Sequence, residues 1–335
     1  MDLGIVIVNW NVRDLLVACL DSVYTDLAQS RLRAAVCVVD NGSSDGSVAM
    51  LRAQFPHTRV IESDNRGMGA GNNLGLRALI ETYEPFALLV LNPDTVIQAG
   101  ALRTLVTFLH EHPQAGVVAP KLLNLDGTLQ HAGFRFPGLR QAAFDLFPPP
   151  PGRFQRLINS PFNGRYPEAW YAAGTPFQVD HTLGAAFAVR RTAIEACGMF
   201  DETFHMYCEE IDWHWRLARA GWERWLAPGA VVTHAGGQST TQVAAQSLIQ
   251  LWASRRRLYQ RYHNFPLNAL VAQLVLAAMR GRIRANHQRS QRGELPPDER
   301  AEINQAWHEI IHIWQGRRPI TNYQLHSGNT PNGNS

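Results

Sequence analysis

Cysteine is scarce in this sequence, and the few cysteines are far apart. The four of them, Cys19, Cys37, Cys197 and Cys208, form none of the close pairs that a zinc knuckle or a redox motif needs. Spacing therefore argues against both kinds of site. We expect reduced thiols in the core of a cytosolic protein.

Long hydrophobic runs are also missing. The N-terminus carries Asp2 and no basic residue, and its apolar run ends at Asn9, too soon for a signal peptide. The longest apolar stretch, Pro266–Met279, is too short to cross a bilayer and contains Asn268 and Gln273. We expect no transmembrane helix and a cytoplasmic location.

A strong excess of one charge is absent as well. The 31 basic and 28 acidic residues leave a formal net charge of only +3, which gives no reason to expect a nucleic-acid partner. With 335 residues, 45% of them hydrophobic, the chain can bury a full core. We expect one large domain with an extension.

Short apolar strands alternate with helical patterns in the first third of the chain. This alternation predicts an α/β fold with a mostly parallel central sheet flanked by helices. The expected strands are Gly4–Val8, Ala34–Val39, Arg59–Glu62 and Phe86–Leu91, and the expected helices include Val48–Phe55, Asn72–Thr82 and Ala99–Glu111.

The later part of the chain changes character twice. Residues 126–178 are rich in glycine, proline and aromatic residues, which indicates irregular structure over the sheet. Strands are expected again at Thr182–Val189, Trp225–Ala227 and Val231–Thr233, and helices with basic residues from about Ser247. We therefore divide the chain into a catalytic domain (1–240), a helical C-terminal extension (241–320) and a disordered tail (321–335).

Polar side chains stand where three predicted strands end, at Asn9, Asp40 and Asp94. Because ligands bind beyond the carboxyl ends of parallel strands, these three positions indicate one crevice. Asp40 suits hydrogen bonding to a base or ribose. The alternative is that Asp40, like Asp45 after it, is a turn or N-cap residue.

Asp94 follows the most hydrophobic strand, behind the rigid Pro93. A carboxylate there can hold Mg²⁺ or Mn²⁺ together with substrate phosphates. The alternative is that Asp94 caps the helix expected at Ala99–Glu111.

Three acids crowd into four positions of an otherwise apolar and aromatic stretch, at Glu209, Glu210 and Asp212. Crowded, partly buried carboxylates raise the pKa of at least one of them, which is how a general base is tuned. Asp212 is four residues from Arg216, so an ion pair on one helix face is expected for it. That pairing leaves Glu209 and Glu210 as candidates for chemistry.

Two further segments could contact a phosphate. His234 ends a predicted strand and precedes Gly236-Gly237, whose backbone amides can approach an anion closely. The glycine-rich segment Arg66–Asn73 lacks the spacing of a dinucleotide-binding fingerprint, which argues against a Rossmann dehydrogenase. We interpret it as a turn that can contact phosphate, with Arg66.

Together these segments resemble the family 2 glycosyltransferases, and within them the bacterial rhamnosyltransferase-like branch that builds surface polysaccharides. The likeness runs from about Gly4 to Ser239. It rests on six ordered motifs: Ile5–Asn11, Val38–Ser47, Asn65–Gly75, Leu91–Thr95, Gly198–Glu202 and Glu209–Asp212, with Gly184-Ala185, Arg190-Arg191 and Arg216 beside them.

The resemblance implies a GT-A fold and an inverting transfer of a sugar from a nucleotide diphosphate sugar to an acceptor hydroxyl. It places Asp40 on the nucleotide base and Asp94 on the divalent metal, with His234 helping because Asn92 replaces the family's first acid. Glu210 takes the position of the catalytic base, usually an Asp, with Glu209 as the alternative. The other donor-site positions that it implies are Asn9, Asn65, Arg66, Gly71, Asn72, Asn92 and Gly184.

The C-terminal extension offers a second surface. Arg255-Arg256-Arg257 and Arg280–Arg284 flank the apolar segment Leu267–Met279, an arrangement suited to the inner face of an anionic membrane. A core-packing helix with solvated ends explains the same pattern. The lipid-linked saccharide acceptors that the resembled family often uses favour peripheral membrane contact.

Two other functions compete with a glycosyltransferase. A sugar-phosphate nucleotidyltransferase normally has a glycine-rich loop after its first strand, and Asn9–Asp14 contains no glycine. A catalytically inactive nucleotide-sugar-binding protein would explain the missing first acid and the Glu at the base position. For the donor, the resembled branch suggests thymidine diphosphate rhamnose, with uridine diphosphate hexoses or hexosamines next.

Overall fold

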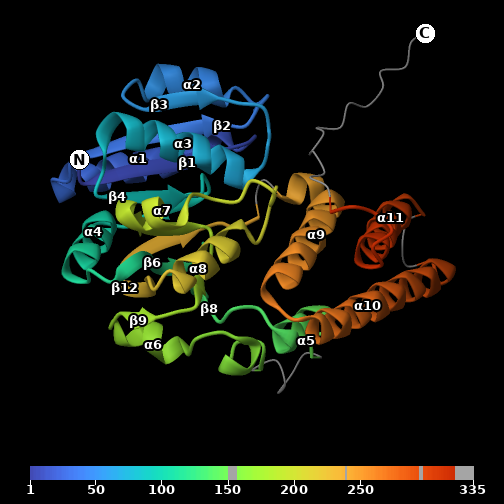
Figure 1. Ribbon diagram of the computed structural model, residues 1–335. Helices are drawn as coiled ribbons and strands as arrows, with labels where there is room; N and C mark the ends of the chain where they lie inside the picture. Colours follow the sequence, from blue (N-terminus) through green and yellow to red (C-terminus); the bar gives the residue numbers. More distant parts are fainter. Residues whose placement is uncertain (150–156, 238–239, 294–296, 321–335) are drawn as a thin grey trace, which may run out of the picture.

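A computed structural model gives the fold, and it describes residues 1–149, 157–237, 240–293 and 297–320 (Figure 1). The tail expected to be disordered, 321–335, lies outside the described residues. Four parallel strands form the first half of the central sheet in the order β3-β2-β1-β4. The elements here are β1 (Leu3–Asn9), α1 (Arg13–Ser30), β2 (Ala34–Asp40), α2 (Ser47–Gln54), β3 (Arg59–Glu62), α3 (Met68–Tyr83) and β4 (Ala87–Leu91).

The second half of the sheet is mixed. It continues from β4 in the order β11-β6-β12-β5, with β11 antiparallel to both of its neighbours and β5 antiparallel to β12. The elements are β5 (Thr95–Ile97), α4 (Ala101–Glu111), β6 (Ala115–Leu123), β11 (Ala186–Arg190), α7 (Arg191–Cys197), α8 (Glu209–Arg219) and β12 (Glu223–His234). The prediction of a mostly parallel α/β sheet is confirmed. The two strands expected at 225–227 and 231–233 are one strand, β12, with a register shift between Ala227 and Val231.

Both faces of the sheet are buried, which explains the continuous apolar runs of its strands. Along β1, Ile5 and Ile7 face the core under α1 and α4, while Val6 and Val8 face the core under α3 and α8. The segment over one end of the sheet is less regular, as expected. It holds β7 (Leu129–Gln130), β8 (Gly133–Phe134), α5 (Leu139–Leu146), the 3₁₀ turn Pro161–Asn163, α6 (Glu168–Ala173), β9 (Phe177–Gln178) and β10 (His181–Thr182).

The glycine-rich segment 66–73 is mostly helical, so our interpretation of it as a turn is wrong. α3 begins at Met68, and two of its glycines, Gly71 and Gly75, face β1. A Cβ on Gly71 would lie 2.9 Å from Val8 Cγ1, and one on Gly75 would lie 2.5 Å from Val6 Cγ1. These glycines therefore let a helix approach a strand closely.

The C-terminal extension is helical, as expected. After the 3₁₀ turn Thr240–Val243 it consists of α9 (Ala244–Tyr262), α10 (Phe265–Gln291) and α11 (Pro297–Trp314), set beside the sheet domain (Figure 1). Its core also takes in Ala142 and Leu146 of α5. Val271, Val275 and Met279 of α10 are buried there, so this part of the apolar segment packs as a core helix. Among the described residues, no helix has the length and apolar content needed to span a bilayer.

Candidate functional site

A pocket of about 270 Å³ opens beyond the carboxyl ends of β1, β2 and β4. Its walls also come from the start of α3, the loop before β11, the start of α8 and the end of β12. The structure brings eight of the predicted site residues together in its lining: Asn65, Asn72, Asn92, Asp94, Gly184, Glu209, Glu210 and His234. Asn9, Asp40, Arg66 and Gly71 are not among the residues that line it.

Asp94 and His234 meet on one wall of the pocket because β5 pairs with β12. The register sets His234 opposite Thr95, and the Ala235 amide donates to the Asp94 carbonyl oxygen over 3.0 Å. His234 Nε2 consequently lies 3.3 Å from Asp94 Oδ1, with both side chains mostly buried. Two segments far apart in the sequence thus supply one polar pair.

Gln130, which the sequence did not single out, faces the other nitrogen of His234. Its Oε1 lies 2.7 Å from His234 Nδ1, and its own Nε2 donates to Asn124 Oδ1 over 3.0 Å. Since Asn124 fixes which end of the Gln130 amide is the acceptor, Nδ1 carries the hydrogen in the neutral ring. The lone pair of Nε2 then points toward the Asp94 carboxylate.

The alternative of Asp94 as a helix cap is wrong. β5 separates Asp94 from α4, whose N-cap is Gly100. The carboxylate that serves this helix end is Asp26 of α1, which accepts from the amides of Gly100 and Leu102. The side chain of Asp94 is therefore left to the pocket.

The residues around Asp94 fit a divalent cation that is shared with a ligand. A carboxylate oxygen and an imidazole nitrogen lie 3.3 Å apart, and both are groups that bind divalent cations. No group of three or more His, Cys, Asp or Glu side chains suited to a metal occurs in the part of the chain that the structure describes. A cation here would thus need further oxygens, such as those of a diphosphate.

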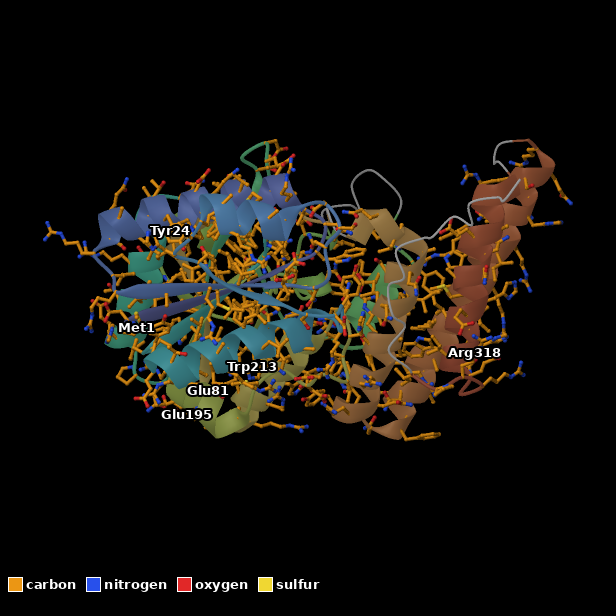
Figure 2. The ribbon with its side chains drawn as sticks, turned by 90° about the horizontal axis from the view of Figure 1, so that it is seen from above. Met1, Tyr24, Glu81, Glu195, Trp213 and Arg318 are labelled. Atoms are coloured by element: carbon orange, nitrogen blue, oxygen red, sulfur yellow. The ribbon has the colours of Figure 1, made fainter. Side chains whose placement is uncertain are left out.

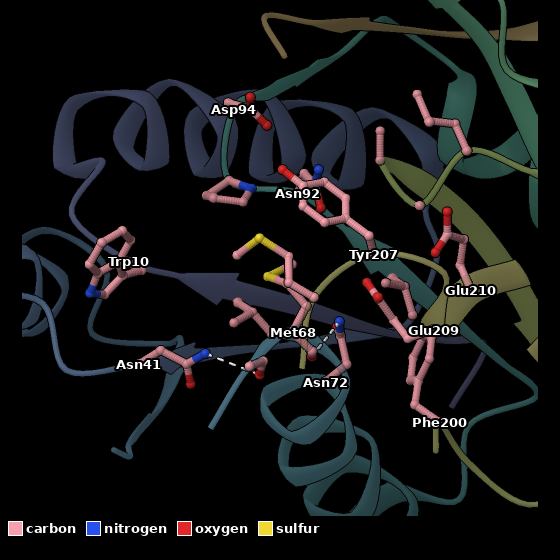
Figure 3. Close-up of a pocket in the computed structure, with 18 of the residues that line it drawn as sticks. Trp10, Asn41, Met68, Asn72, Asn92, Asp94, Phe200, Tyr207, Glu209 and Glu210 are labelled. Atoms are coloured by element: carbon pink, nitrogen blue, oxygen red, sulfur yellow. Dashed lines mark hydrogen bonds between the residues drawn. The ribbon is translucent and has the colours of Figure 1, made fainter. Parts of the chain in front are cut away.

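Glu209 and Glu210 begin α8 on another side of the pocket (Figure 3). The two residues before them, Tyr207 and Cys208, both have a φ of 67°, a left-handed conformation that is costly for residues with a side chain. This conformation turns the chain sharply into the helix, and the carboxyl groups of Glu209 and Glu210 then lie at the pocket.

Burial raises the pKa of both carboxyl groups. For Glu210 the pKa rises to about 7, against the opposing effect of backbone N–H groups at the start of α8. The pKa of Glu209 is raised well above its usual value, by burial first and then by the charge of Glu210. Glu209 Oε2 has no hydrogen-bond partner among the described residues. Burial is the first cause of both rises in pKa, and the predicted crowding of charge contributes at Glu209 alone.

Asp212, the third acid of the cluster, is structural. Its carboxylate pairs with Arg216 over 2.9 Å, as predicted, and with Arg261 over 2.7 Å. The hydroxyl of Tyr262 donates to it as well, over 2.7 Å. Since Arg261 and Tyr262 belong to α9, this buried carboxylate ties the helix of the two glutamates to the C-terminal extension.

Trp10 and Asn41 lie at the end of the pocket opposite the two glutamates (Figure 3). The side-chain oxygens of Asn41 and Asn72 are buried and have no hydrogen-bond partner among the described residues. Their amide groups are held by the carbonyl oxygens of Gly67 and Met68, so the free acceptors are fixed in place. At this end the pocket lining combines an aromatic ring with polar side chains, which suits a ligand that carries a flat ring and hydroxyl groups.

Asp40 and Asn9 lie behind this end of the pocket. Asp40 is only 2% exposed and accepts from the Asn9 side-chain amide over 2.9 Å and from the Ser43 amide over 2.8 Å. In this arrangement the two residues shape the loop that carries Asn41.

Arg66 and Gly67 connect α3 to the loop that precedes α8. Arg66 is exposed and pairs with Glu202 over 3.2 Å. Gly67 has a φ of 98°, and a Cβ there would lie 2.1 Å from the His205 carbonyl oxygen. A motif that resembles a phosphate loop therefore serves close backbone packing.

The pocket residues that sequence reasoning missed gave weak signals. Trp10 lies in the motif Ile5–Asn11, and its signal was an aromatic residue directly after a predicted strand. Met68 lies in the glycine-rich segment Arg66–Asn73, and Tyr207 lies just before the acid cluster. In both places the neighbouring residues carried the stronger signal. Gln130, which does not line the pocket but contacts His234, comes from the region expected to be irregular, and no pattern marks it.

Comparison with known proteins gives a consistent result. Residues 4–159 match the family model "Glycosyl transferase family 2". The N-acetylglucosaminyl-diphospho-decaprenol L-rhamnosyltransferase of Mycobacterium tuberculosis is 28% identical over 229 residues, which are 64% of this chain and 70% of that protein. The low-salt glycan biosynthesis hexosyltransferase Agl10 of Haloferax volcanii is 28% identical over 65% of this chain and 62% of its own length.

Solved structures share the fold. The mannosyltransferase PcManGT from Pyrobaculum calidifontis, in complex with GDP-Man and Mn²⁺, has a TM-score of 0.54 at 16% identity, over 93% of this chain and 85% of that one. GalNAc-T7 with UDP, GalNAc and Mn²⁺ has a TM-score of 0.51 at 15% identity, over 70% of this chain but only 43% of that one. At such identities the likeness establishes the architecture alone, which is of the GT-A type.

Proposed function

We propose that this chain, whose residues 4–159 match the family 2 glycosyltransferase domain and whose relatives include an L-rhamnosyltransferase and a hexosyltransferase, moves a sugar from a nucleotide diphosphate sugar to an acceptor hydroxyl with inversion. The observation that carries this proposal is one pocket with two polar poles. Asp94 and His234 form one, and Glu209 and Glu210 form the other.

The donor is proposed to lie with its nucleoside at Trp10 and Asn41, because an aromatic ring beside a polar side chain suits a base and ribose. The diphosphate then lies beside Asp94 and His234, with Asn92 next to them. A bound Mg²⁺ or Mn²⁺ would supply the positive charge that the leaving diphosphate needs. Asp40, Asn9, Arg66 and Gly71 would support this end of the site from behind the pocket surface.

Glu210 is proposed as the general base, with Glu209 as its neighbour that keeps the pair from ionising fully. The ionised Glu210 takes the proton of the acceptor hydroxyl while that oxygen forms its bond to the anomeric carbon. The bond from the anomeric carbon to the diphosphate oxygen breaks at the same time, and the electron pair leaves with the diphosphate. A pKa near 7 suits this task, because the group is then available as a base at neutral pH.

Residues 1–240 are proposed to form the catalytic domain and residues 241–320 the extension that braces α8 through Arg261 and Tyr262. The similarity to the mycobacterial N-acetylglucosaminyl-diphospho-decaprenol L-rhamnosyltransferase supports a lipid-linked saccharide acceptor and a rhamnose donor. A role in cell-surface polysaccharide or glycolipid synthesis, at the inner face of the cytoplasmic membrane, follows from such an acceptor.

A thermal-shift panel of nucleotide diphosphate sugars with Mn²⁺, Mg²⁺ or chelator tests the proposal, since a ligand that binds only the folded state raises its melting temperature. We expect metal-dependent stabilisation by one nucleotide family, lost in Asp94→Ala. Stabilisation without hydrolysis or transfer would favour an inactive binding protein, and no response to any nucleotide would contradict the donor site.

A further inference from the structure

Positive charge is concentrated in the C-terminal helices. Residues 244–292 contain nine of the 31 basic residues and none of the 28 acidic ones, so the rest of the chain has more acids than bases. Some of these arginines are used internally, as Arg255 is with Asp145 and Arg261 with Asp212. Two others, Arg280 and Arg284, line one groove.

A groove of about 280 Å³ runs between α10 and α11. Arg280 and Arg284 line it from α10, one helical turn apart, and His308 and His312 line it from α11 with the same spacing. Arg317, just after α11, completes the basic wall. Among the described residues, no carboxylate lines the groove or forms an ion pair with any of these three arginines.

This arrangement is unfavourable without a counter-charge. Like charges one turn apart on a helix repel each other, and Arg317 adds a third guanidinium to the same groove. Ile283 and Ile311 line the same groove, so an apolar surface lies beside these exposed arginines. Guanidinium groups bind phosphate oxygens through paired N–H donors, so the groove matches a phosphate group.

The exposed face of α10 indicates where that phosphate comes from. Positions 269, 273, 277, 280 and 284 are exposed and recur every three or four residues, so they follow one face of the helix. At the start of this face Phe265 is 82% exposed and Leu270 is 47% exposed. The face therefore begins apolar and ends in arginines, the pattern of a helix that lies in a lipid interface. Figure 1 shows α10 and α11 on the side of the molecule away from α1 and α4.

We propose that the groove between α10 and α11 binds the phosphate of an anionic lipid, through Arg280, Arg284 and Arg317, while Phe265 and Leu270 lie in the same membrane surface. Every lipid bilayer has a phosphate layer with an apolar interior beneath it. The arginines of this face match the phosphate layer, and Phe265 and Leu270 match the apolar interior. The inference rests on the membrane association proposed above, but it makes no use of the donor or of the transfer step.

Vesicle flotation of the full chain, without donor or acceptor, tests the proposal. Vesicles of phosphatidylcholine are compared with vesicles of phosphatidylcholine and phosphatidylglycerol in equal parts. We expect binding only to the second kind, weakened by salt. Arg280→Gln with Arg284→Gln should lower the vesicle affinity roughly 25-fold, since each basic residue near an anionic surface contributes about fivefold.

The matched control removes the same charge elsewhere. Arg31 and Arg103 are exposed, and Arg31→Gln with Arg103→Gln should leave the affinity within about twofold. Arg317→Gln, outside the helices, gives an independent loss if the first pair disturbs folding. Equal binding by groove and control variants would overturn the proposal, and so would failure of the wild-type chain to float with either lipid.

A third arm separates lipid from free anion. If inorganic phosphate raises the melting temperature through Arg280 and Arg284 while vesicles recruit nothing, the groove is a site for a soluble anion and the lipid proposal is wrong. None of these outcomes changes the transferase assignment, because nucleotide-sugar binding is measured separately.

Discussion

His234 presents a lone pair to Asp94 because Gln130 holds its other ring nitrogen. The chain of contacts runs from Asn124 through Gln130 to His234 Nδ1, and from Nε2 to Asp94 Oδ1 over 3.3 Å. The pairing of β5 with β12 sets the distance, and the amide of Gln130 sets the tautomer. The proposed cation site thus depends on a residue that contacts neither cation nor substrate.

Gln130→Leu should weaken Mn²⁺ binding in the presence of nucleoside diphosphate by about 10- to 100-fold, the usual effect of removing a partner of a metal-ligating histidine. Gln130→Glu keeps an acceptor for Nδ1 and should retain most of the affinity. The Mn²⁺ concentration that gives half-maximal nucleotide binding is the readout. Equal loss in both variants would indicate a packing role instead.

Asp94→Asn should lower kcat by about 100-fold or more and remove the metal dependence of nucleotide binding. Asp64→Asn, an exposed carboxylate in the neighbouring loop, is the matched control and should change neither. Steady-state kinetics with a metal titration checks this. A variant that keeps its metal response would place the cation elsewhere.

The pH profile of kcat/KM should rise with pH through an apparent pKa of about 7 and level off above it, because only ionised Glu210 can take a proton. Glu210→Gln should lose this limb together with most of the activity. An acid limb centred near the ordinary value of 4.5 would show that the burial of Glu210 does not govern catalysis.

The same burial costs stability. A carboxyl whose pKa is raised from 4.5 to about 7 on folding gives its full stability below pH 4.5, and that stability is lost as the pH rises toward 7. Glu210→Gln should therefore unfold at a higher temperature than the wild type at pH 8, with a smaller difference at pH 5. Thermal melts at the two pH values measure it, and a lower melting temperature for the variant at pH 8 would contradict the sign.

Gly67→Ala should be far more harmful than Gly127→Ala. Both residues have a positive φ, but a Cβ on Gly67 would lie 2.1 Å from the His205 carbonyl oxygen, whereas nothing lies within 4 Å of one on Gly127. The control therefore isolates the backbone cost, about 1–2 kcal/mol in the free energy of unfolding. The first variant should add a steric cost and shift the loop before α8. Urea unfolding compares them, and equal losses would remove the close contact as the reason for Gly67.

The sequence predicted the parallel half of the sheet well because its strands are buried on both faces and read as continuous apolar runs. Local signals, a polar side chain at a strand end or an acid cluster, marked Asp94, His234, Glu209 and Glu210. The family resemblance supplied the other four pocket residues, Asn65, Asn72, Asn92 and Gly184. The partnership of Asp94 with His234 is not local, because it follows from the pairing of β5 with β12.

Packing contacts explain the remaining differences. Gly71 belongs to a glycine-rich segment that resembles a binding turn in sequence. In the structure, Gly71 and Gly75 allow α3 to pack closely against β1. Asp94 looks like a helix cap until Asp26, from another helix, is seen in that place. Gln130 has no sequence signal, because its role comes from the tertiary position of His234.

Release of nucleoside diphosphate from a panel of nucleotide sugars, by the wild type and by the Asp94→Asn and Glu210→Gln variants, tests the central claim most directly. The account predicts metal-dependent release from one donor by the wild type, strongly reduced in both variants while Asp64→Asn remains active. Release at the wild-type rate in both variants, or from no donor at all, would contradict it.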